Sequence, residues 1–179
     1  MMFKATGEEY DSIYDVFSVK GALIGFIRSW GWVYPSEMWC EAMLVDLAAM
    51  TWRKELYGFE IKEEGDNVST GIEQCKQYLS GFDRVYLAAT TAPRKETLLR
   101  IERLGFGYVQ VKLISDPEAK RTHARIHCLL IAPLNHPVPE VRADIHRKFH
   151  NAIDELKVEP HRGQQTVLLP VTESTSGIS

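Results

Sequence analysis

The sequence has no long apolar run, no signal-like start and few cysteines. No stretch approaches the roughly 20 consecutive apolar residues that a membrane-spanning helix needs. Residues 1–9 contain no apolar core ahead of a cleavage site, so nothing in them predicts secretion. The 3 cysteines are far apart and include no Cys-x-x-Cys pair, which argues against a disulfide framework. We therefore expect reduced thiols, a cytoplasmic location and no membrane segment.

The chain also lacks a strong excess of charge of either sign, since its formal net charge is −3. A strongly basic domain would be the clearer mark of a nucleic-acid-binding protein, because phosphate contacts come from lysine and arginine. Acidic residues gather in the segment 63–67 and in the tail. The basic residues of the second half are Arg94, Lys95, Arg100, Arg103, Lys112, Lys120, Arg121 and Arg125. They form either a local basic cleft or an ordinary solvated face, and the charge excludes only tight, non-specific coating of DNA.

Length and composition are those of an ordinary globular protein. The sequence of 179 residues is 45% hydrophobic and 25% charged, which suits one domain that can bury a substantial core. No internal repeat is evident. We expect a single domain over residues 1–159. After Pro160 the chain is largely polar, so residues 160–179 are expected to form a flexible tail.

The most informative feature is a set of charged residues inside two neighbouring apolar runs. Asp46 interrupts the run 43–50, and Glu60 and Lys62 lie in the run 56–62. Both runs predict strands, and the polar segment 51–54 predicts the turn between them. Glu60 and Lys62 share one strand face because side chains alternate, and a hairpin would bring Asp46 beside Glu60. An unpaired buried carboxylate costs several kcal/mol, so Asp46 requires a metal or a partner.

These residues resemble the motif of the PD-(D/E)xK nuclease superfamily, which includes restriction enzymes, archaeal Holliday-junction resolvases and repair nucleases. The leading Pro-Asp dipeptide of that motif is absent, because Val45 precedes Asp46. The resemblance covers residues 17 to 90, about half of the chain. The stretch 72–78, followed by 83–87, also resembles the superfamily's glutamine-and-tyrosine helix that leads into the last core strand.

The order of expected elements matches the superfamily core of helix, three strands, helix and strand. A helical period over residues 8–30 ends at Gly31, and a capping-box pattern of Thr70 and Glu73 opens a second helix. The expected core elements are helix 8–30, strands 32–40, 43–50 and 56–62, helix 71–79 and strand 84–90. Beyond the core we expect helix 93–104, strands 108–114 and 121–131, and helix 139–158. The predicted fold class is therefore α/β: a restriction-endonuclease-like core over about 8–90, with a central mixed sheet flanked by helices. Residues 93–159 extend it by two strands and a C-terminal helix.

The resemblance implies a metal-dependent site. Asp46, Glu60 and the backbone carbonyl of Ile61 would bind Mg²⁺ or Mn²⁺, which prefer oxygen ligands. Lys62 would position or deprotonate a water molecule and stabilise developing negative charge. Gln74 would orient the nucleophile or contact the phosphate, with a surface helix residue as the alternative.

Two further assignments concern neighbours of this site. Tyr78 lies one helical turn after Gln74, and we expect its side chain to have a packing role and no part in the chemistry. A further carboxylate is expected from upstream, with Glu37 preferred over Glu41 and Asp15. Pro35 leaves the register of that strand open.

The first functional hypothesis is a Mg²⁺- or Mn²⁺-dependent nuclease that hydrolyses phosphodiester bonds in DNA, structure-selective or of the repair and recombination type. RNA is not excluded as a substrate, and a homodimer is expected by analogy. The second hypothesis is a catalytically silent module on the same fold that binds nucleic acid or protein. A third is a zinc hydrolase using His146 and His150, although the stretch lacks the glutamate of zinc proteases and a third ligand. Trp52, in the expected turn, could stack on a base if exposed.

Overall fold

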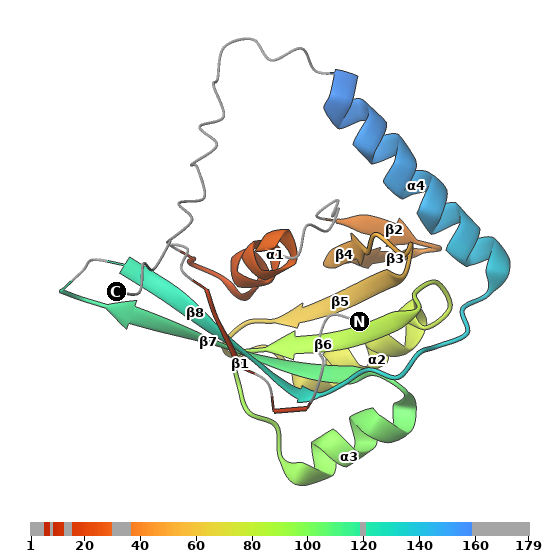
Figure 1. Ribbon diagram of the computed structural model, residues 1–179. Helices are drawn as coiled ribbons and strands as arrows, with labels where there is room; N and C mark the ends of the chain where they lie inside the picture. The colour runs from red at the N-terminus through yellow and green to blue at the C-terminus, as the bar shows by residue number, and fades with distance from the viewer. Residues whose placement is uncertain (1–5, 8, 13–15, 30–36, 119–120, 159–179) are drawn as a thin grey trace, which may run out of the picture.

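The structure is a computed structural model that describes residues 6–7, 9–12, 16–29, 37–118 and 121–158 (Figure 1). Its centre is a mixed six-stranded sheet in the order β1-β8-β7-β6-β5-β4. The strands are β1 Glu9–Ser12, β4 Leu47–Met50, β5 Leu56–Lys62, β6 Arg84–Ala89, β7 Gly107–Asp116 and β8 Arg121–Leu130. Strands β5, β6 and β7 run parallel to one another, and the remaining neighbours are antiparallel. The predicted tail 160–179 falls outside the described residues.

Two further strands form a separate antiparallel ribbon, β2 Met38–Cys40 and β3 Met43–Val45. The ribbon packs through the buried side chains of Met38, Cys40 and Val45. The chain bends at Asp46 and then enters the six-stranded sheet as β4. Asp46 therefore joins two different sheets.

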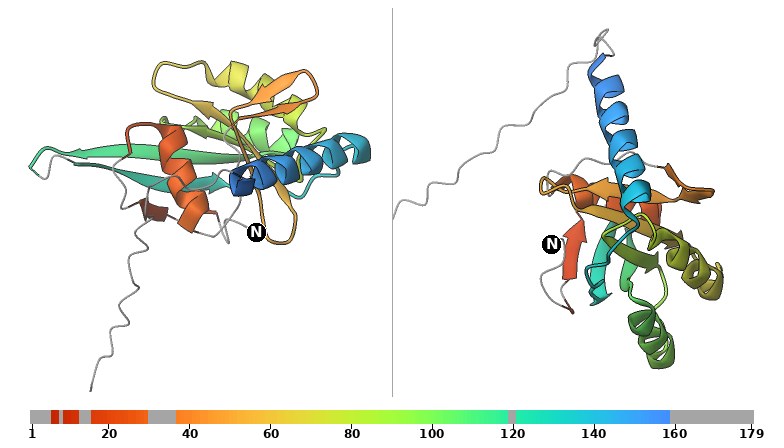
Figure 2. Two further views of the ribbon diagram at one scale, coloured as in Figure 1. Left: turned by 90° about the horizontal axis from the view of Figure 1, so that it is seen from above. Right: turned by 90° about the vertical axis from the view of Figure 1, so that its right-hand side faces the viewer.

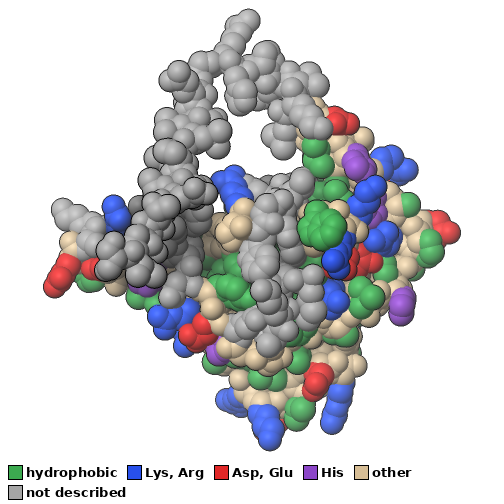
Figure 3. Space-filling model, in the orientation of Figure 1, with side chains coloured by type: hydrophobic (Ala, Val, Ile, Leu, Met, Phe, Trp, Pro, Cys, Tyr) green, Lys and Arg blue, Asp and Glu red, His purple; other side chains and the backbone are tan. Residues whose placement is uncertain are grey.

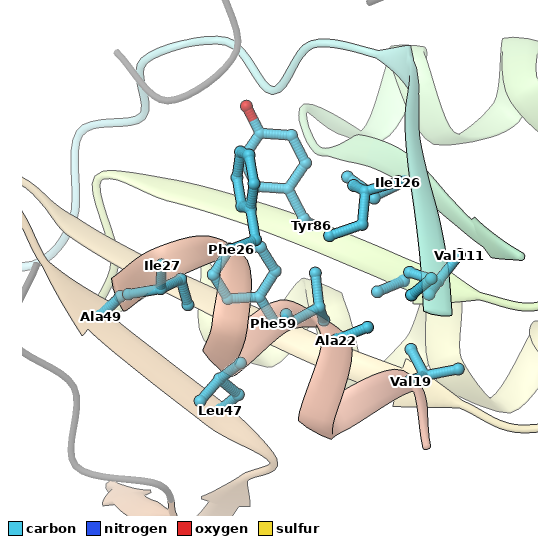
Figure 4. Packing of buried hydrophobic residues seen from close by; sticks show 14 of the residues in the cluster. Val19, Ala22, Phe26, Ile27, Leu47, Ala49, Phe59, Tyr86, Val111 and Ile126 are labelled. Atoms are coloured by element: carbon cyan, nitrogen blue, oxygen red, sulfur yellow. The ribbon is translucent and has the colours of Figure 1, made fainter. Parts of the chain in front are cut away.

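Helices cover both faces of the large sheet. Helix α1 Val19–Ser29 lies on one face, where Ala22, Phe26 and Ile27 pack against side chains of the strands (Figure 4). The other face is covered by α2 Val68–Tyr78 and α3 Lys95–Leu104, and the buried side of α4 Pro139–Val158 packs against the ribbon. Figure 2 shows the long hairpin of β7 and β8 reaching beyond the helices at one end. The predicted mixed α/β architecture, a central mixed sheet flanked by helices, is thus confirmed.

Strand β5 shows why the sequence folds in this way. Tyr57 and Phe59 point to the α1 face, whereas Leu56 belongs to the core on the α2 face. Glu60 and Lys62 are four and six residues after Leu56, and because side chains alternate along a strand they lie on the same α2 face. The β4–β5 turn is closed by Thr51, whose N–H donates to the Glu55 carbonyl at 2.9 Å. The predicted strand 56–62 and turn 51–54 are both confirmed.

Most predicted elements of the second half are also present. Helix 139–158 has its predicted bounds, and strands 84–90, 108–114 and 121–131 differ by at most two residues at each end. Helix α3 begins two residues later than predicted and ends at Gly105, whose φ of 85° is the left-handed conformation that glycine adopts readily. No helix in the described part of the chain is long and apolar enough to cross a membrane.

The predicted helix 8–30 is wrong in its first half. Residues Glu9–Ser12 form β1, which pairs with β8 at the edge of the sheet, and the helix begins only at Val19. Its start is fixed by Ser18, whose Oγ accepts a hydrogen bond from the Gly21 N–H at 3.0 Å. Pairing with a strand more than 100 residues away thus overrides the local helical period.

Three other boundaries are corrected. The predicted strand 43–50 is divided at Asp46 into β3 and β4. Of the predicted strand 32–40, the described part forms β2 only, and residues 30–36 lie outside the description. Helix α2 begins at Val68, and its N-cap is Asn67, whose Oδ1 accepts from the Ser69 N–H at 2.8 Å. The predicted cap at Thr70 is therefore wrong, because an asparagine three residues earlier serves as the cap.

Candidate active site

The register of the β4–β5 hairpin brings Asp46 to Glu60. The last pair of that ladder is Leu47 with Phe59, so continuing it by one residue places Asp46 opposite Glu60. The partly buried Asp46 side chain turns back onto β5, where its Oδ2 accepts a hydrogen bond from the Ile61 N–H at 2.9 Å. The carboxylate that interrupts an apolar run is therefore satisfied by the strand that carries the other charged residues.

Glu60 is fully buried, with 0% of its surface exposed. Its Oε1 accepts a hydrogen bond from Lys62 Nζ at 2.6 Å, and its Oε2 accepts one from the Tyr78 hydroxyl. Burial raises the pKa of the Glu60 carboxyl, and the negative charge of Asp46 adds to this rise. The hydrogen bonds from Lys62 and Tyr78 act in the opposite direction. Glu60 is thus a buried acid whose charged form depends on these two donors.

Lys62 connects the strand to helix α2. Its Nζ also donates to Gln74 Oε1 at 3.0 Å, so the ammonium group lies between Glu60 and Gln74. Gly71, on the same helix, makes this approach possible. A Cβ atom there would lie 2.8 Å from Leu87 Cδ1 and 2.9 Å from Lys62 Cε. The missing side chain lets α2 lie directly against the aliphatic part of Lys62.

Tyr78 also takes part in the network through its hydroxyl, whereas the sequence predicted only packing for this residue. Besides the bond to Glu60, its hydroxyl lies 3.2 Å from the carbonyl oxygen of Leu44 in the ribbon. Burial, together with the Glu60 carboxylate, raises the pKa of Tyr78 far above its ordinary value, so the phenol keeps its proton. The four-residue spacing of Gln74 and Tyr78, which places both on one helix face, was the signal for this contact.

The upstream carboxylates are placed differently. Glu37 is exposed and pairs with Lys20 at 2.8 Å, outside the hydrogen-bonded network. Continuing the β2–β3 register by one residue nevertheless places Glu37 opposite Asp46, because Met38 pairs with Val45. Glu41 lies at the other end of the ribbon, where it accepts from Ser80 Oγ at 3.1 Å. Asp15 lies outside the described residues.

Glu63, directly after Lys62, is a further neighbour of the site that no sequence pattern indicated. Its Oε1 accepts a hydrogen bond from the Val19 N–H at 2.9 Å, which caps the first turn of α1. The end of β5 is thus fixed to helices on both faces of the sheet, through Lys62 on one face and Glu63 on the other.

The donor set fits a hard divalent cation. Asp46 and Glu60 supply carboxylate oxygens, and the Ile61 carbonyl points to the same side of β5 as its N–H, toward Asp46. The β4–β5 ladder stops at Phe59, so none of the described strands pairs with Ile61 on that side. No three His, Cys, Asp or Glu side chains of the described residues are grouped closely enough to hold a metal. A cation here would have two carboxylates, one carbonyl and water, as is usual for Mg²⁺.

The remaining predicted residues lie apart from this network. Trp52 is 78% exposed at the β4–β5 turn, and the Arg53 guanidinium lies 4.6 Å from its ring centre. His146 is half-buried on α4, whereas His150 one turn later is exposed.

Comparison with known proteins gives a likeness in fold. No protein-family model and no curated protein matches the chain. Among solved structures, the chain is similar to the SPO1766 protein of unknown function from Silicibacter pomeroyi. The two share 19% sequence identity with a TM-score of 0.54, over 86% of this chain and 99% of that chain. Identity this low shows a shared fold and carries no information about activity.

Proposed function

We propose that the chain is a Mg²⁺- or Mn²⁺-dependent nuclease with a restriction-endonuclease-like core that hydrolyses phosphodiester bonds. One observation carries this proposal: Asp46, Glu60, Lys62 and Gln74, chosen from the sequence, lie together at the end of one strand. Two of the contacts join segments that are more than ten residues apart in the chain. A solvated strand face, the alternative for Glu60 and Lys62, does not account for a fully buried glutamate.

The residues suit a division of roles. Asp46, Glu60 and the Ile61 carbonyl would hold the cation, whose Lewis acidity neutralises charge on the phosphate and makes a nearby water easier to deprotonate. Lys62 would hold the attacking water and stabilise negative charge as it develops on the phosphate. Gln74 holds the lysine ammonium in place and would contact the phosphate or the water. Glu37 is proposed as a carboxylate at the mouth of the site, because its strand register leads to Asp46.

The substrate class follows from the edge on which the site lies. Lys62, Ala89 and Gln110 are in register, so the site opens at the carboxyl ends of the parallel strands, where open α/β sheets bind ligands. Arg94, Lys95 and Lys112 are exposed near that edge and have no acidic partner among the described side chains. These cations suit the phosphates of a DNA strand, with RNA as the alternative polymer. Structure-selective or repair-type cleavage by a homodimer, as the superfamily resemblance suggests, remains part of the proposal.

The second candidate function is a module that binds nucleic acid or protein without cutting. One observation favours it: both carboxylate oxygens of Glu60 are hydrogen-bonded within the protein, and the side chain has no exposed surface. In that case the network would be a buried polar cluster that stabilises the fold. Titration of the protein with Mn²⁺ separates the two functions, because only the nuclease requires a bound cation.

The first prediction is metal-dependent cleavage that requires Asp46 and Lys62. Labelled duplex, single-stranded, flap and four-way-junction DNA are incubated with the protein and Mg²⁺, Mn²⁺ or chelator. Asp46→Asn and Lys62→Ala should each lower the rate about 10²-fold or more, because each removes a group that acts in the transition state. A matched Asp–Lys pair on α4, Asp144 and Lys148 at 2.6 Å, provides the controls Asp144→Asn and Lys148→Ala.

The outcomes separate the hypotheses. Cleavage that both site variants lose and both control variants keep supports the nuclease. Cleavage that survives Lys62→Ala points to a contaminating enzyme and contradicts the proposal. A protein that neither cuts nor binds Mn²⁺ has the second function instead.

A further inference from the structure

The hydroxyl of Tyr78 lies between the two segments that carry the candidate metal ligands. On one side it donates to Oε2 of Glu60 on β5, and on the other it lies 3.2 Å from the carbonyl oxygen of Leu44 on β3. Leu44 precedes Asp46 by two residues. Tyr78 itself lies in the last turn of α2, so a third element brings the two segments together.

Neither β-ladder next to Asp46 holds this residue in place. The ladder of the six-stranded sheet ends at Leu47, and the ladder of the ribbon ends at Val45. The residue between them is a bend with no strand partner in either sheet. Its position depends on the bond of its own carboxylate to the Ile61 N–H and on how the ribbon is docked. The Tyr78–Leu44 contact is a polar link between that ribbon and α2.

We propose that Tyr78 is a positioning residue, whose hydroxyl holds Glu60 against the ribbon and thereby sets the separation of the Asp46 and Glu60 carboxylates. This inference rests on the proposed function, because a fixed separation matters only if both groups bind one cation. The single phenolic proton goes mainly to Glu60, which is the closer and charged acceptor. That bond occupies Oε2, so a cation bound by Glu60 would share Oε1 with the Lys62 ammonium group.

The hydroxyl can be tested apart from the ring. The ring is buried and packs against Phe82, with centroids 6.2 Å apart. Tyr78→Phe keeps this packing and removes only the hydroxyl. Tyr57 offers a matched control, because it is also fully buried and its hydroxyl donates to a glutamate, Glu55 Oε2, at 3.1 Å. Tyr57 faces α1, so Tyr57→Phe removes the same kind of bond on the other face of the sheet.

The second prediction concerns metal affinity, measured by calorimetric titration of the full chain with Mn²⁺ alone. Tyr78→Phe should weaken Mn²⁺ binding about 10- to 100-fold, the usual effect of losing a group that orients a metal ligand. Tyr57→Phe should bind as the unaltered protein does. Cleavage by Tyr78→Phe should also require more Mn²⁺ yet approach the normal maximal rate at saturation, whereas Lys62→Ala stays inactive at every concentration.

Each result decides the matter. Mn²⁺ affinity that is unchanged in Tyr78→Phe overturns the inference and leaves the proposed function standing. An unaltered protein that binds neither Mn²⁺ nor Mg²⁺ overturns the proposed function and this inference together. Circular dichroism establishes whether Tyr78→Phe is folded. If it is not, Tyr78→Met, which fills the same space with a flexible apolar chain, is titrated instead with the same expectation.

Discussion

His146 illustrates how burial and neighbouring charges can make the contribution of one residue to stability sensitive to pH. Its Nε2 atom is buried on α4, and no described residue hydrogen-bonds to it. Burial lowers the pKa of His146, and the positive charge of Arg142 lowers it further, with smaller contributions from His150 and Lys54. Asp83 acts in the opposite direction. The folded protein therefore prefers the neutral ring.

The third prediction follows from the sign of this shift. Because the folded-state pKa of His146 lies below the ordinary 6.5, its stabilising contribution is present above that pH and is lost as the pH falls through the lowered pKa. His146→Gln should reduce the loss of unfolding free energy between about pH 7.5 and about pH 5. Urea denaturation at both values measures it. His150→Gln provides the comparison: His150 acts on the pKa of His146 only as a minor neighbouring charge, so this variant should have a much smaller effect, and an equal effect of both variants would contradict the assignment.

At the residue scale, the sequence predicted which residues of the candidate site lie together better than it predicted their hydrogen bonds. Asp46, Glu60 and Lys62 stood out because charges inside apolar strands are costly. Gln74 followed from the family resemblance. The role of the Tyr78 hydroxyl was missed, because the sequence shows only that a tyrosine lies on the right helix face. Whether its polar end reaches Glu60 depends on how closely α2 approaches β5, and Gly71 sets that distance.

Among the elements, α4 is fastened to the sheet by one buried carboxylate. Asp83, directly before β6, accepts from the Leu56 N–H of β5 at 2.7 Å. The same carboxylate accepts two bonds from Arg142 of α4, both at 2.9 Å. Arg142 also donates to the Lys54 carbonyl at 3.1 Å, so it reaches the β4–β5 turn. One ion pair thus connects the beginnings of two strands with the C-terminal helix.

The fourth prediction is that this pair contributes much more to stability than the exposed pairs do. Asp83→Ala should lower the free energy of unfolding by about 3 kcal/mol, because it leaves the arginine and the Leu56 N–H without their acceptor. Asp144→Ala, which removes the exposed pair with Lys148, should cost less than about 1 kcal/mol. Urea denaturation at one pH compares the two variants. Equal losses would show that Asp83 is as well solvated as a surface residue.

Element boundaries were predictable where local patterns and tertiary packing agree. The strand predicted from the apolar run 56–62 and the helix predicted over 139–158 have their correct bounds. Strand β1 was missed because its partner, β8, lies more than 100 residues away, and an edge strand of four residues leaves almost no pattern of its own. The division of 43–50 at Asp46 was missed because both halves are apolar and read as one run.

At the scale of the whole molecule, binding of a polyanion depends on which cations of the described residues lack acidic partners. The net charge is −3, and on the face drawn in Figure 3 basic and acidic side chains are interspersed. Many of the described lysines and arginines already have acidic partners, as Lys76 and Arg100 have in Glu73. Near the carboxyl ends of the parallel strands, by contrast, Arg94, Lys95 and Lys112 have none within the described part of the chain.

The fifth prediction is therefore a shallow salt dependence of DNA binding. If about three phosphates are neutralised at this edge, the association constant should fall about 40-fold between about 50 mM and about 200 mM salt. Fluorescence anisotropy with duplex DNA and the Asp46→Asn protein measures binding without cleavage. Replacing Arg94, Lys95 and Lys112 by alanine should flatten the slope to near zero. A slope that the triple variant retains would move the binding surface elsewhere.

The bend at Asp46 has a consequence for how the protein fails under mild stress. Asp46 follows the ribbon and Glu60 lies in the six-stranded sheet, so the position of one carboxylate relative to the other depends on the docking of the small ribbon. Structures of this size open locally at lower free energy than the whole fold requires. Departure of the ribbon would separate Asp46 from Glu60 and expose Met38, Cys40 and Val45, while the six-stranded sheet stayed intact. If the proposed function is right, inactivation and global unfolding are therefore expected to be two events, with the first occurring at lower temperature or denaturant concentration than the second.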